Sequence, residues 1–162
     1  MKFLISILIA VLSLSMIQAQ NDTITDSRDG QTYLTVKIGE QIWTAQNMNF
    51  EKPGSYCYAG KAANCETYGR LYTWEAAKDV CPDGWHLPSD DEWKELESFL
   101  GMSEGELDKS DDWRGSDQGK KLLSDKSIGF NILLGGYRNP PSNYFLEGMQ
   151  AFFWTSTEVH SQ

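Results

Sequence analysis

A capped amphipathic helix over residues 90–100 constrains the fold more than any other feature of this sequence. Ser89 followed by Glu92 is the pattern of a capping box, in which the hydroxyl accepts a hydrogen bond from a first-turn amide and the carboxylate accepts one from the amide of the cap residue. Apolar residues then recur at helical spacing until Gly101: Trp93, Leu96, Phe99 and Leu100. We expect this stripe to be buried against a core.

An alternating segment before this helix predicts a β-hairpin. Leu34, Val36 and Ile38 alternate with other residues, which is the pattern of a strand with one buried face. Gly39-Glu40 interrupts the alternation, and Ile42-Trp43 resumes it. Because a type II′ turn requires glycine in the first of its two central positions, we expect a hairpin closed by that turn.

The other elements are expected from weaker patterns. Residues 51–64 are expected to form a loop, whereas the apolar spacing over residues 69–81 predicts an amphipathic helix. The apolar run 130–134 predicts a buried strand, and residues 151–157 predict a second strand after a turn at 139–143. The sequence therefore predicts an α+β fold of two central helices with short antiparallel strands.

The N-terminus has the pattern of a secretory signal peptide over residues 1–19. Residues 3–17 form an apolar run broken only by serines, and Ala19 offers a small residue at a cleavage site. A transmembrane anchor is the competing interpretation, but this run of 15 residues is shorter than the roughly 20 needed to span a bilayer. We expect cleavage near Ala19, a flexible segment at 20–28, no later membrane span, and a secreted, periplasmic or cell-surface protein.

The charge balance disfavours a nucleic-acid partner. The 162 residues include 14 Lys and Arg against 23 Asp and Glu, a formal net charge of −9. Affinity for nucleic acid comes mostly from basic side chains that neutralise phosphates. A hydrophobic content of 40% is too high for a disordered acidic tail, so we expect one globular domain over residues 29–162.

Three cysteines fit an exported protein but do not all pair. Cys57 and Cys65 lie eight positions apart across a loop, so a local disulfide between them is expected in an oxidising compartment. Cys81 is then left as an unpaired thiol. A zinc site would need four ligands at recognisable spacing, which these cysteines and two histidines do not supply.

Patterns for catalysis are weak. Ser156, His86 and Asp83 supply the residue types of a hydrolytic triad, but no nucleophile-elbow pattern surrounds the serine. A packed, hydrogen-bonded histidine is the simpler interpretation of His86, and the capping box already accounts for Glu92. We therefore expect no catalytic residues and no enzymatic activity, with a cryptic hydrolase as the alternative.

An acidic loop offers hard oxygen ligands for calcium. Its carboxylates are Asp108, Asp111, Asp112 and Asp117. Their spacing does not follow the EF-hand order, and a solvated acidic loop accounts for them better. We expect no metal ligands and no cofactor, with calcium binding kept as a weaker alternative.

Aromatic residues favour a binding role. Six Trp and seven Tyr supply large contact area at low entropic cost. Most of the tryptophans, including Trp154 in an expected strand, are assigned to the core. The loop around the Pro-Pro turn instead provides the expected recognition residues, which are Tyr137, Arg138, Asn139 and Tyr144. The expected partner is a carbohydrate or a cell-surface protein.

Several ordered motifs resemble the Fibrobacter succinogenes major paralogous domain family. They are DGQTYLTVKIGEQIWTAQNMN (29–49), GRLYTW (69–74), CPDGWHLPSDDEW (81–93), GFNILLGGYRN (129–139) and FFWTSTE (152–158). The resemblance implies an exported bacterial surface or periplasmic module without an established chemistry. Its GWHLP segment is also similar to that of formylglycine-generating enzymes, which implies a C-type-lectin-like fold by analogy alone.

The sequence departs from this family pattern at its end. Members usually continue through further strands to a pattern around SVRCV, whereas this sequence stops at Gln162. The resemblance implies that the missing C-terminal strand would carry the cysteine that pairs with Cys81. Either the chain is truncated, and in the extreme a nonfunctional fragment, or a partner chain covers the open sheet edge. Copper-dependent formylglycine chemistry is excluded, because it needs two late cysteines and none follows Cys81.

Overall fold

The computed structural model describes residues 22–109, 113–124 and 128–158. Their elements are the strands and helices β1 (Thr23–Thr25), β2 (Thr32–Ile38), β3 (Gln41–Thr44), β4 (Ser55–Tyr56), the 3₁₀ helix η1 (Tyr58–Gly60), α1 (Ala62–Tyr68), β5 (Leu71–Tyr72), α2 (Trp74–Ala77), α3 (Asp90–Phe99), α4 (Glu104–Leu107), α5 (Gln118–Ser124), β6 (Gly135–Asn139) and β7 (Asn143–Glu147). The expected α+β mixture is confirmed. The expected signal peptide lies outside the described residues. None of the described helices is long and apolar enough to cross a membrane.

The first three strands form an antiparallel sheet in the order β1-β2-β3. The predicted hairpin is confirmed, since Ile38 pairs with Gln41 across a two-residue turn. Gly39 has a φ of 61° and Glu40 has no positive φ, which is the type II′ combination. β1 lies within the segment that was expected to be flexible, and the side chain of Asp26 just after it is fully buried.

The buried face of β2 differs in part from the prediction. Val36 and Ile38 are buried as expected, but Leu34 is 43% exposed. Tyr33 is buried in its place, and its hydroxyl accepts a hydrogen bond from the backbone amide of Asn49 at 3.1 Å. Contacts from a distant loop therefore bury the opposite face at this end of the strand.

The capped helix is confirmed as α3. Ser89 accepts from the amide of Glu92, and the Glu92 carboxylate accepts from the amide of Ser89, which together make the capping box. Leu96 and Leu100 are buried, whereas Phe99 is 63% exposed, against the expectation for the whole stripe. The ring of Phe99 instead lies against Gly39 at the tip of the β2–β3 hairpin.

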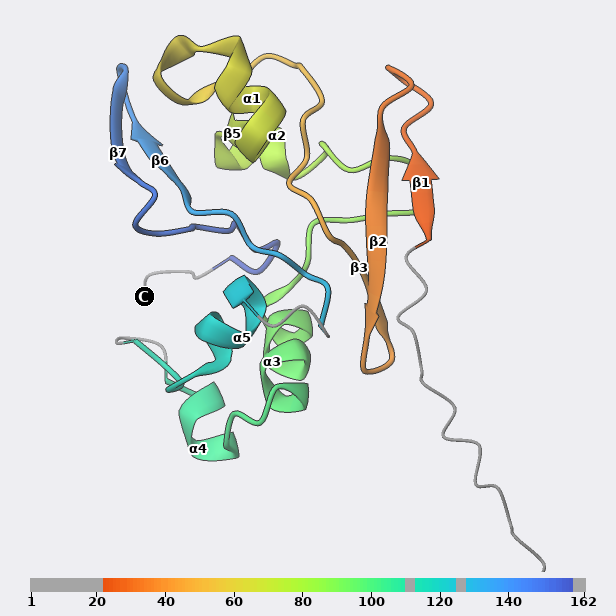
Figure 1. Cartoon of the computed structure of the whole chain (residues 1–162), viewed down its shortest axis with the longest axis vertical. Helices are drawn as coiled ribbons and strands as arrows, with labels where there is room; N and C mark the ends of the chain where they lie inside the picture. The colour runs from red at the N-terminus through yellow and green to blue at the C-terminus, as the bar shows by residue number, and fades with distance from the viewer. Residues whose placement is uncertain (1–21, 110–112, 125–127, 159–162) are drawn as a thin grey trace, which may run out of the picture.

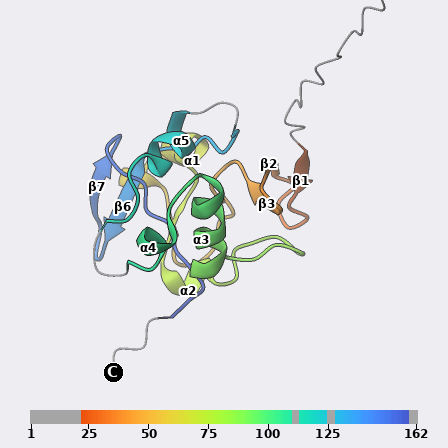
Figure 2. The same cartoon turned by 90° about the horizontal axis from the view of Figure 1, so that it is seen from below.

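The core lies where α3 packs on the sheet. Its buried residues are Val36, Ile38, Leu96, Leu100, Leu122 and Phe130, with Trp43 and Trp93 packed against them. Figures 1 and 2 both show the sheet on one side of the molecule and the β6–β7 hairpin on the other, with the helices between and beside them. The hydrophobic core is therefore concentrated on the sheet side.

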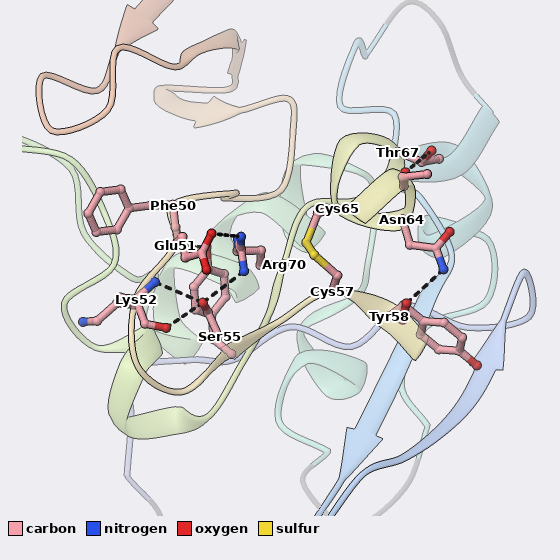
Figure 3. The surroundings of a disulfide bond; sticks show 12 residues. Phe50, Glu51, Lys52, Ser55, Cys57, Tyr58, Asn64, Cys65, Thr67 and Arg70 are labelled. Atoms are coloured by element: carbon pink, nitrogen blue, oxygen red, sulfur yellow. Dashed lines mark hydrogen bonds and ion pairs between the residues drawn. A yellow bond between two sulfur atoms is a disulfide. The ribbon is translucent and has the colours of Figure 1, made fainter. Parts of the chain in front are cut away.

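The segment expected to be a loop before residue 64 contains short regular elements and a disulfide. Cys57 precedes η1, Cys65 lies in α1, and the two sulfur atoms are bonded, which confirms the predicted pair. Figure 3 shows this bond beside the ion pair between Arg70 and Glu51, whose closest atoms are 2.6 Å apart. The disulfide and this ion pair fix α1 to the chain that precedes it.

The helix expected over residues 69–81 is wrong in extent. Gly69, with a φ of 75°, ends α1, and Leu71 and Tyr72 then pair with β4 as strand β5. Only Trp74–Ala77 is helical, and the Thr73 hydroxyl caps it by accepting from the amide of Ala76. At the start of this segment, Leu71 and Tyr72 pair with a strand earlier in the chain and therefore do not form the helix that the apolar spacing predicts.

The two late strands are also displaced from their expected positions. The run 130–134 is not a strand, since Asn131 has a φ of 49° that interrupts extended backbone. The strand follows it as β6, which pairs with β7 across the predicted turn. Residues 151–157 form no strand either, because Ala151 alone makes a bridge, to Gly136.

Candidate functional site

A cleft of about 1120 Å³ lies between the sheet, α3 and the β6–β7 hairpin. Its walls come from β3, from α1 and β5, from residues 84–88, and from β6. Residues 151–154 complete the lining, on the chain that returns from β7. Segments that are distant in the sequence therefore line the same cleft.

Aromatic rings line the side of the cleft next to the core. The ring centroids of Trp43 and Trp93 are 4.9 Å apart, and Phe130 lies 5.8 Å from Trp43. The ring of Phe153 lies 5.3 Å from that of Trp93. These separations are typical of tilted and edge-to-face aromatic contacts, so this wall is a packed aromatic surface.

A second aromatic group lies on the hairpin side. The ring of Tyr137 stacks on Phe145 at 5.4 Å and meets Phe152 edge-on at 5.0 Å. Phe152, Phe153 and Trp154 are 51%, 39% and 49% exposed. The core assignment of Trp154 is therefore wrong. Contiguous exposed apolar surface of this kind is typical of an interaction site.

The aromatic segment, residues 152–154, is held against the start of α3 by hydrogen bonds of the residues that follow it. The amide of Ser156 donates to the carbonyl of Pro88 at 2.9 Å, and the Thr157 hydroxyl accepts from the amide of Asp90 at 2.9 Å. The two sequence motifs around Pro88 and Thr155 thus dock on each other. Strand pairing does not hold this segment; isolated hydrogen bonds do.

The predicted recognition residues lie on strands β6 and β7, not in a loop. Tyr137, Arg138 and Asn139 line the cleft, whereas Tyr144 does not. The guanidinium of Arg138 lies 3.7 Å above the ring of Tyr56 and 5.9 Å from that of Tyr144. The structure brings three of the four residues to one wall and leaves Tyr144 as support.

Sequence reasoning missed the exposed aromatic part of this lining, at residues 152–154. Their spacing carried a usable signal, because a strand with one buried face points successive side chains to opposite sides. Three large aromatic residues in succession cannot all lie on such a face. That run therefore indicates a segment with accessible aromatic surface.

The candidate triad residues are not brought together. The Nε2 atom of His86 lies 2.7 Å from Oε1 of Glu92, and no hydrogen bond joins His86 to Ser156 among the described residues. Burial alone would raise the pKa of Glu92, but hydrogen bonds from Ser89 and His86 outweigh it and hold that pKa below its usual value. Asp83 is exposed.

The acidic residues proposed for calcium are dispersed where the structure describes them. Asp117 pairs with Lys121 at 3.2 Å, and Asp108 lies 3.9 Å from Lys94. Asp111 and Asp112 lie outside the described residues. Within the described ranges, no group of three or more His, Cys, Asp or Glu residues is arranged to hold a metal ion.

Cys81 is a free thiol that lines the cleft. Burial raises the pKa of this thiol, an effect that the nearby positive charge of Arg28 opposes only in part. A thiol with a raised pKa is protonated and weakly nucleophilic at neutral pH.

Comparison with known protein families identifies the family of this domain. A family model described as the Fibrobacter succinogenes major domain matches residues 36–162, which is more than half of the chain. No curated protein and no solved structure matches. The matched range contains α3, both late hairpin strands and all of the aromatic segment.

Proposed function

Because the chain belongs to the Fibrobacter succinogenes major domain family, and because its domain contains an aromatic cleft, we propose that it is a non-catalytic binding module. The ligand is held in the cleft between β3 and the β6–β7 hairpin. In this proposal the module works outside the cytoplasm, in the periplasm or at the cell surface, after loss of residues 1–19. The pattern of those residues is what supports export.

One observation carries the proposal: three consecutive exposed aromatic side chains line a preformed cleft. Ligand sites are concave and mostly apolar, with a few polar groups that orient the ligand. Here Phe152, Phe153 and Trp154 provide the apolar surface. Arg138 and Asn139 provide polar groups on the facing hairpin. This combination suits a carbohydrate or a polypeptide.

A hydrolase is the less well supported alternative. A nucleophilic serine needs a base within hydrogen-bond reach. His86 instead engages Glu92, which the capping box holds in place. An activity lost on His86→Ala and Ser156→Ala, measured as turnover of model glycosides or esters, would support the hydrolase and contradict the binding module.

We also propose that the fold is related to the C-type-lectin-like group. The supports are the GWHLP resemblance and the arrangement of helices between short antiparallel strands. The proposal needs neither calcium nor another cofactor, and titration with calcium checks this. A calcium-dependent rise in the melting temperature would contradict that part of the proposal.

Binding is tested with the purified chain against two panels: immobilised polysaccharides and a phage-displayed library of random linear peptides. Phe152→Ala removes a ring that lines the cleft and is 51% exposed, and Phe99→Ala removes a ring outside the cleft lining that is 63% exposed. For whichever probe binds, we expect Phe152→Ala to weaken binding about tenfold and Phe99→Ala to change it by less than about twofold. No binding in either panel, or equal effects of the two variants, would contradict the proposed function.

A further inference from the structure

We propose that the occupant of the cleft is an extended, basic polypeptide segment from another protein, which adds a strand to the free edge of β3. This inference rests on the proposed function and names the class of its ligand. Three observations support it: unpaired backbone groups face the cleft, the cleft is large, and the chain has a net negative charge.

The hydrogen-bond pattern of the sheet shows that β3 has a free edge. In an antiparallel pair, directly opposite residues alternate between exchanging hydrogen bonds and pointing their N–H and C=O groups outward. Ala45 donates to Leu34, and the amide of Thr35 points the other way, to Asp22. Thr44 is opposite Thr35. The N–H and C=O groups of Thr44 therefore point away from β2, toward the free edge of the sheet.

The same alternation exposes a second residue on that edge. Ile42 is opposite Lys37, two positions from the pair of Thr44 and Thr35. Among the described residues, the backbone groups of Ile42 and Thr44 have no hydrogen-bond partner outside the β2–β3 pair. Both residues line the cleft. An unpaired edge of this kind is a template for a further strand.

Backbone donors are also free on other walls of the cleft. The amides of Phe153 and Trp154, and the amide of Leu133, donate no hydrogen bond to any described residue. All three residues line the cleft. The three residues are exposed, Phe153 at 39%, Trp154 at 49% and Leu133 at 43%, so these amides are available to a ligand. A polypeptide supplies alternating donors and acceptors along its whole length, which a saccharide does not.

The size of the cleft favours a polymer segment over a small molecule. Its volume of about 1120 Å³ lies above the roughly 300–1000 Å³ of typical small-ligand pockets. A strand alternates its side chains between two sides. One set would contact the wall next to the core, which includes Trp43 and Phe153, and the other would contact the wall on the hairpin side, which includes Phe152 and Tyr137.

The net negative charge of the chain favours a basic polypeptide as the ligand. The chain has a formal net charge of −9. Of the two arginines that line the cleft, Arg70 is paired with Glu51, whereas Arg138 lies over the Tyr56 ring and forms no ion pair with a described residue. Glu92 also lines the cleft and is paired with His86. Glu66 lines the cleft and forms no ion pair with a described residue. A second copy of this acidic chain would be repelled, so a basic partner is complementary.

Thr44→Pro tests the strand pairing directly. Proline removes the outward N–H of Thr44, and edge positions tolerate it because that N–H makes no bond to β2. Thr44→Val keeps the N–H and changes only the side chain. For a basic peptide selected from the phage library, we expect Thr44→Pro to weaken binding about tenfold or more and Thr44→Val to change it by less than about threefold.

The outcomes separate this inference from the proposed function. Binding of polysaccharides but not peptides, or peptide binding that Thr44→Pro leaves unchanged, would overturn the strand pairing and leave the binding module standing. Binding in neither panel would overturn both. Self-association that Thr44→Pro abolishes, measured by sedimentation, would show a second copy as the occupant and overturn the choice of partner. Near-UV circular dichroism of each variant confirms that its aromatic packing is retained.

Discussion

The indole groups of Trp74 and Trp154 donate reciprocal hydrogen bonds between two distant segments. Nε1 of Trp74 donates to the carbonyl of Thr155 at 3.2 Å, and Nε1 of Trp154 donates to the carbonyl of Tyr72 at 2.8 Å. Each indole thus bonds the backbone beside or near the other. This pair fixes the aromatic segment against β5 and α2, and so shapes one wall of the cleft.

We expect Trp74→Phe and Trp154→Phe each to lower the free energy of unfolding by about 1 kcal/mol or more, because each removes one hydrogen bond. The double variant should lose less than the sum of the two, since both bonds hold the same segment. Trp85→Phe is the control: its indole bonds no described residue. Urea unfolding gives the free energy of unfolding of the two single variants, the double variant and the control, each relative to the native chain. If the losses of the two single variants add up to the loss of the double variant, the two hydrogen bonds are not coupled.

Ser89→Ala tests the cap of α3. The serine hydroxyl accepts from the amide of Glu92 and donates to its carboxylate, so the variant should lose about 1 kcal/mol of stability. Ser103→Ala is the matched control, because Ser103 precedes α4 without a side-chain capping bond. We expect its loss to stay under about 0.5 kcal/mol by urea unfolding. Equal losses would show that the capping box contributes nothing specific.

The ion pair of Asp26 and Arg28 predicts a pH dependence. The Arg28 hydrogen bond holds the pKa of the buried Asp26 carboxyl below its usual value. The ionised pair therefore stabilises the fold at pH above about 4, the ordinary aspartate pKa. That stability is lost as the pH falls through the lower pKa of the folded state. Asp26→Asn should lose about 3 kcal/mol at neutral pH, measured by urea unfolding.

The difference in stability between the native chain and Asp26→Asn should shrink on acidification. Glu40→Gln serves as the control, because Glu40 and Lys37 form an ion pair that is largely exposed. Its loss should be under about 1 kcal/mol. If the difference for Asp26→Asn stayed constant down to strongly acidic pH, the pKa of Asp26 would not be linked to folding.

Cys81 should react slowly in the folded chain. Since burial raises the pKa of its thiol, little thiolate forms at about pH 8, below the ordinary thiol pKa of about 8.5. We expect iodoacetamide to modify one thiol per unreduced chain, because Cys57 and Cys65 are bonded. The rate should rise on denaturation in urea. A folded-state rate equal to that of N-acetylcysteine would contradict this account.

The parts of the fold that the sequence predicts well depend on local signals. The α3 cap and the turn at Gly39 rest on residues within a few positions of one another, and both are confirmed. The expected helix at 69–81 failed because Tyr72 pairs with Ser55, a contact that no local spacing reveals. Likewise, Tyr33 rather than Leu34 is buried because a distant loop covers it.

The candidate site was predictable only in part for the same reason. Tyr137 and Arg138 were singled out from a Pro-Pro turn, which does place them on the cleft. The exposed rings at 152–154 were assigned to a strand, because aromatic content favours strands when packing is unknown. Their position depends instead on the reciprocal bonds of Trp74 and Trp154, which join residues far apart in the sequence.

Amide hydrogen exchange at Thr44, with and without a selected basic peptide, tests the central claim most directly. The Thr44 amide points away from β2, whereas the Trp43 amide lies at a hydrogen-bonded position opposite Val36. We predict rapid exchange at Thr44 in the free chain and exchange slowed about tenfold or more when the peptide saturates it, with Trp43 protected in both states. Unchanged exchange at Thr44 in the saturated complex would contradict the addition of a strand to β3.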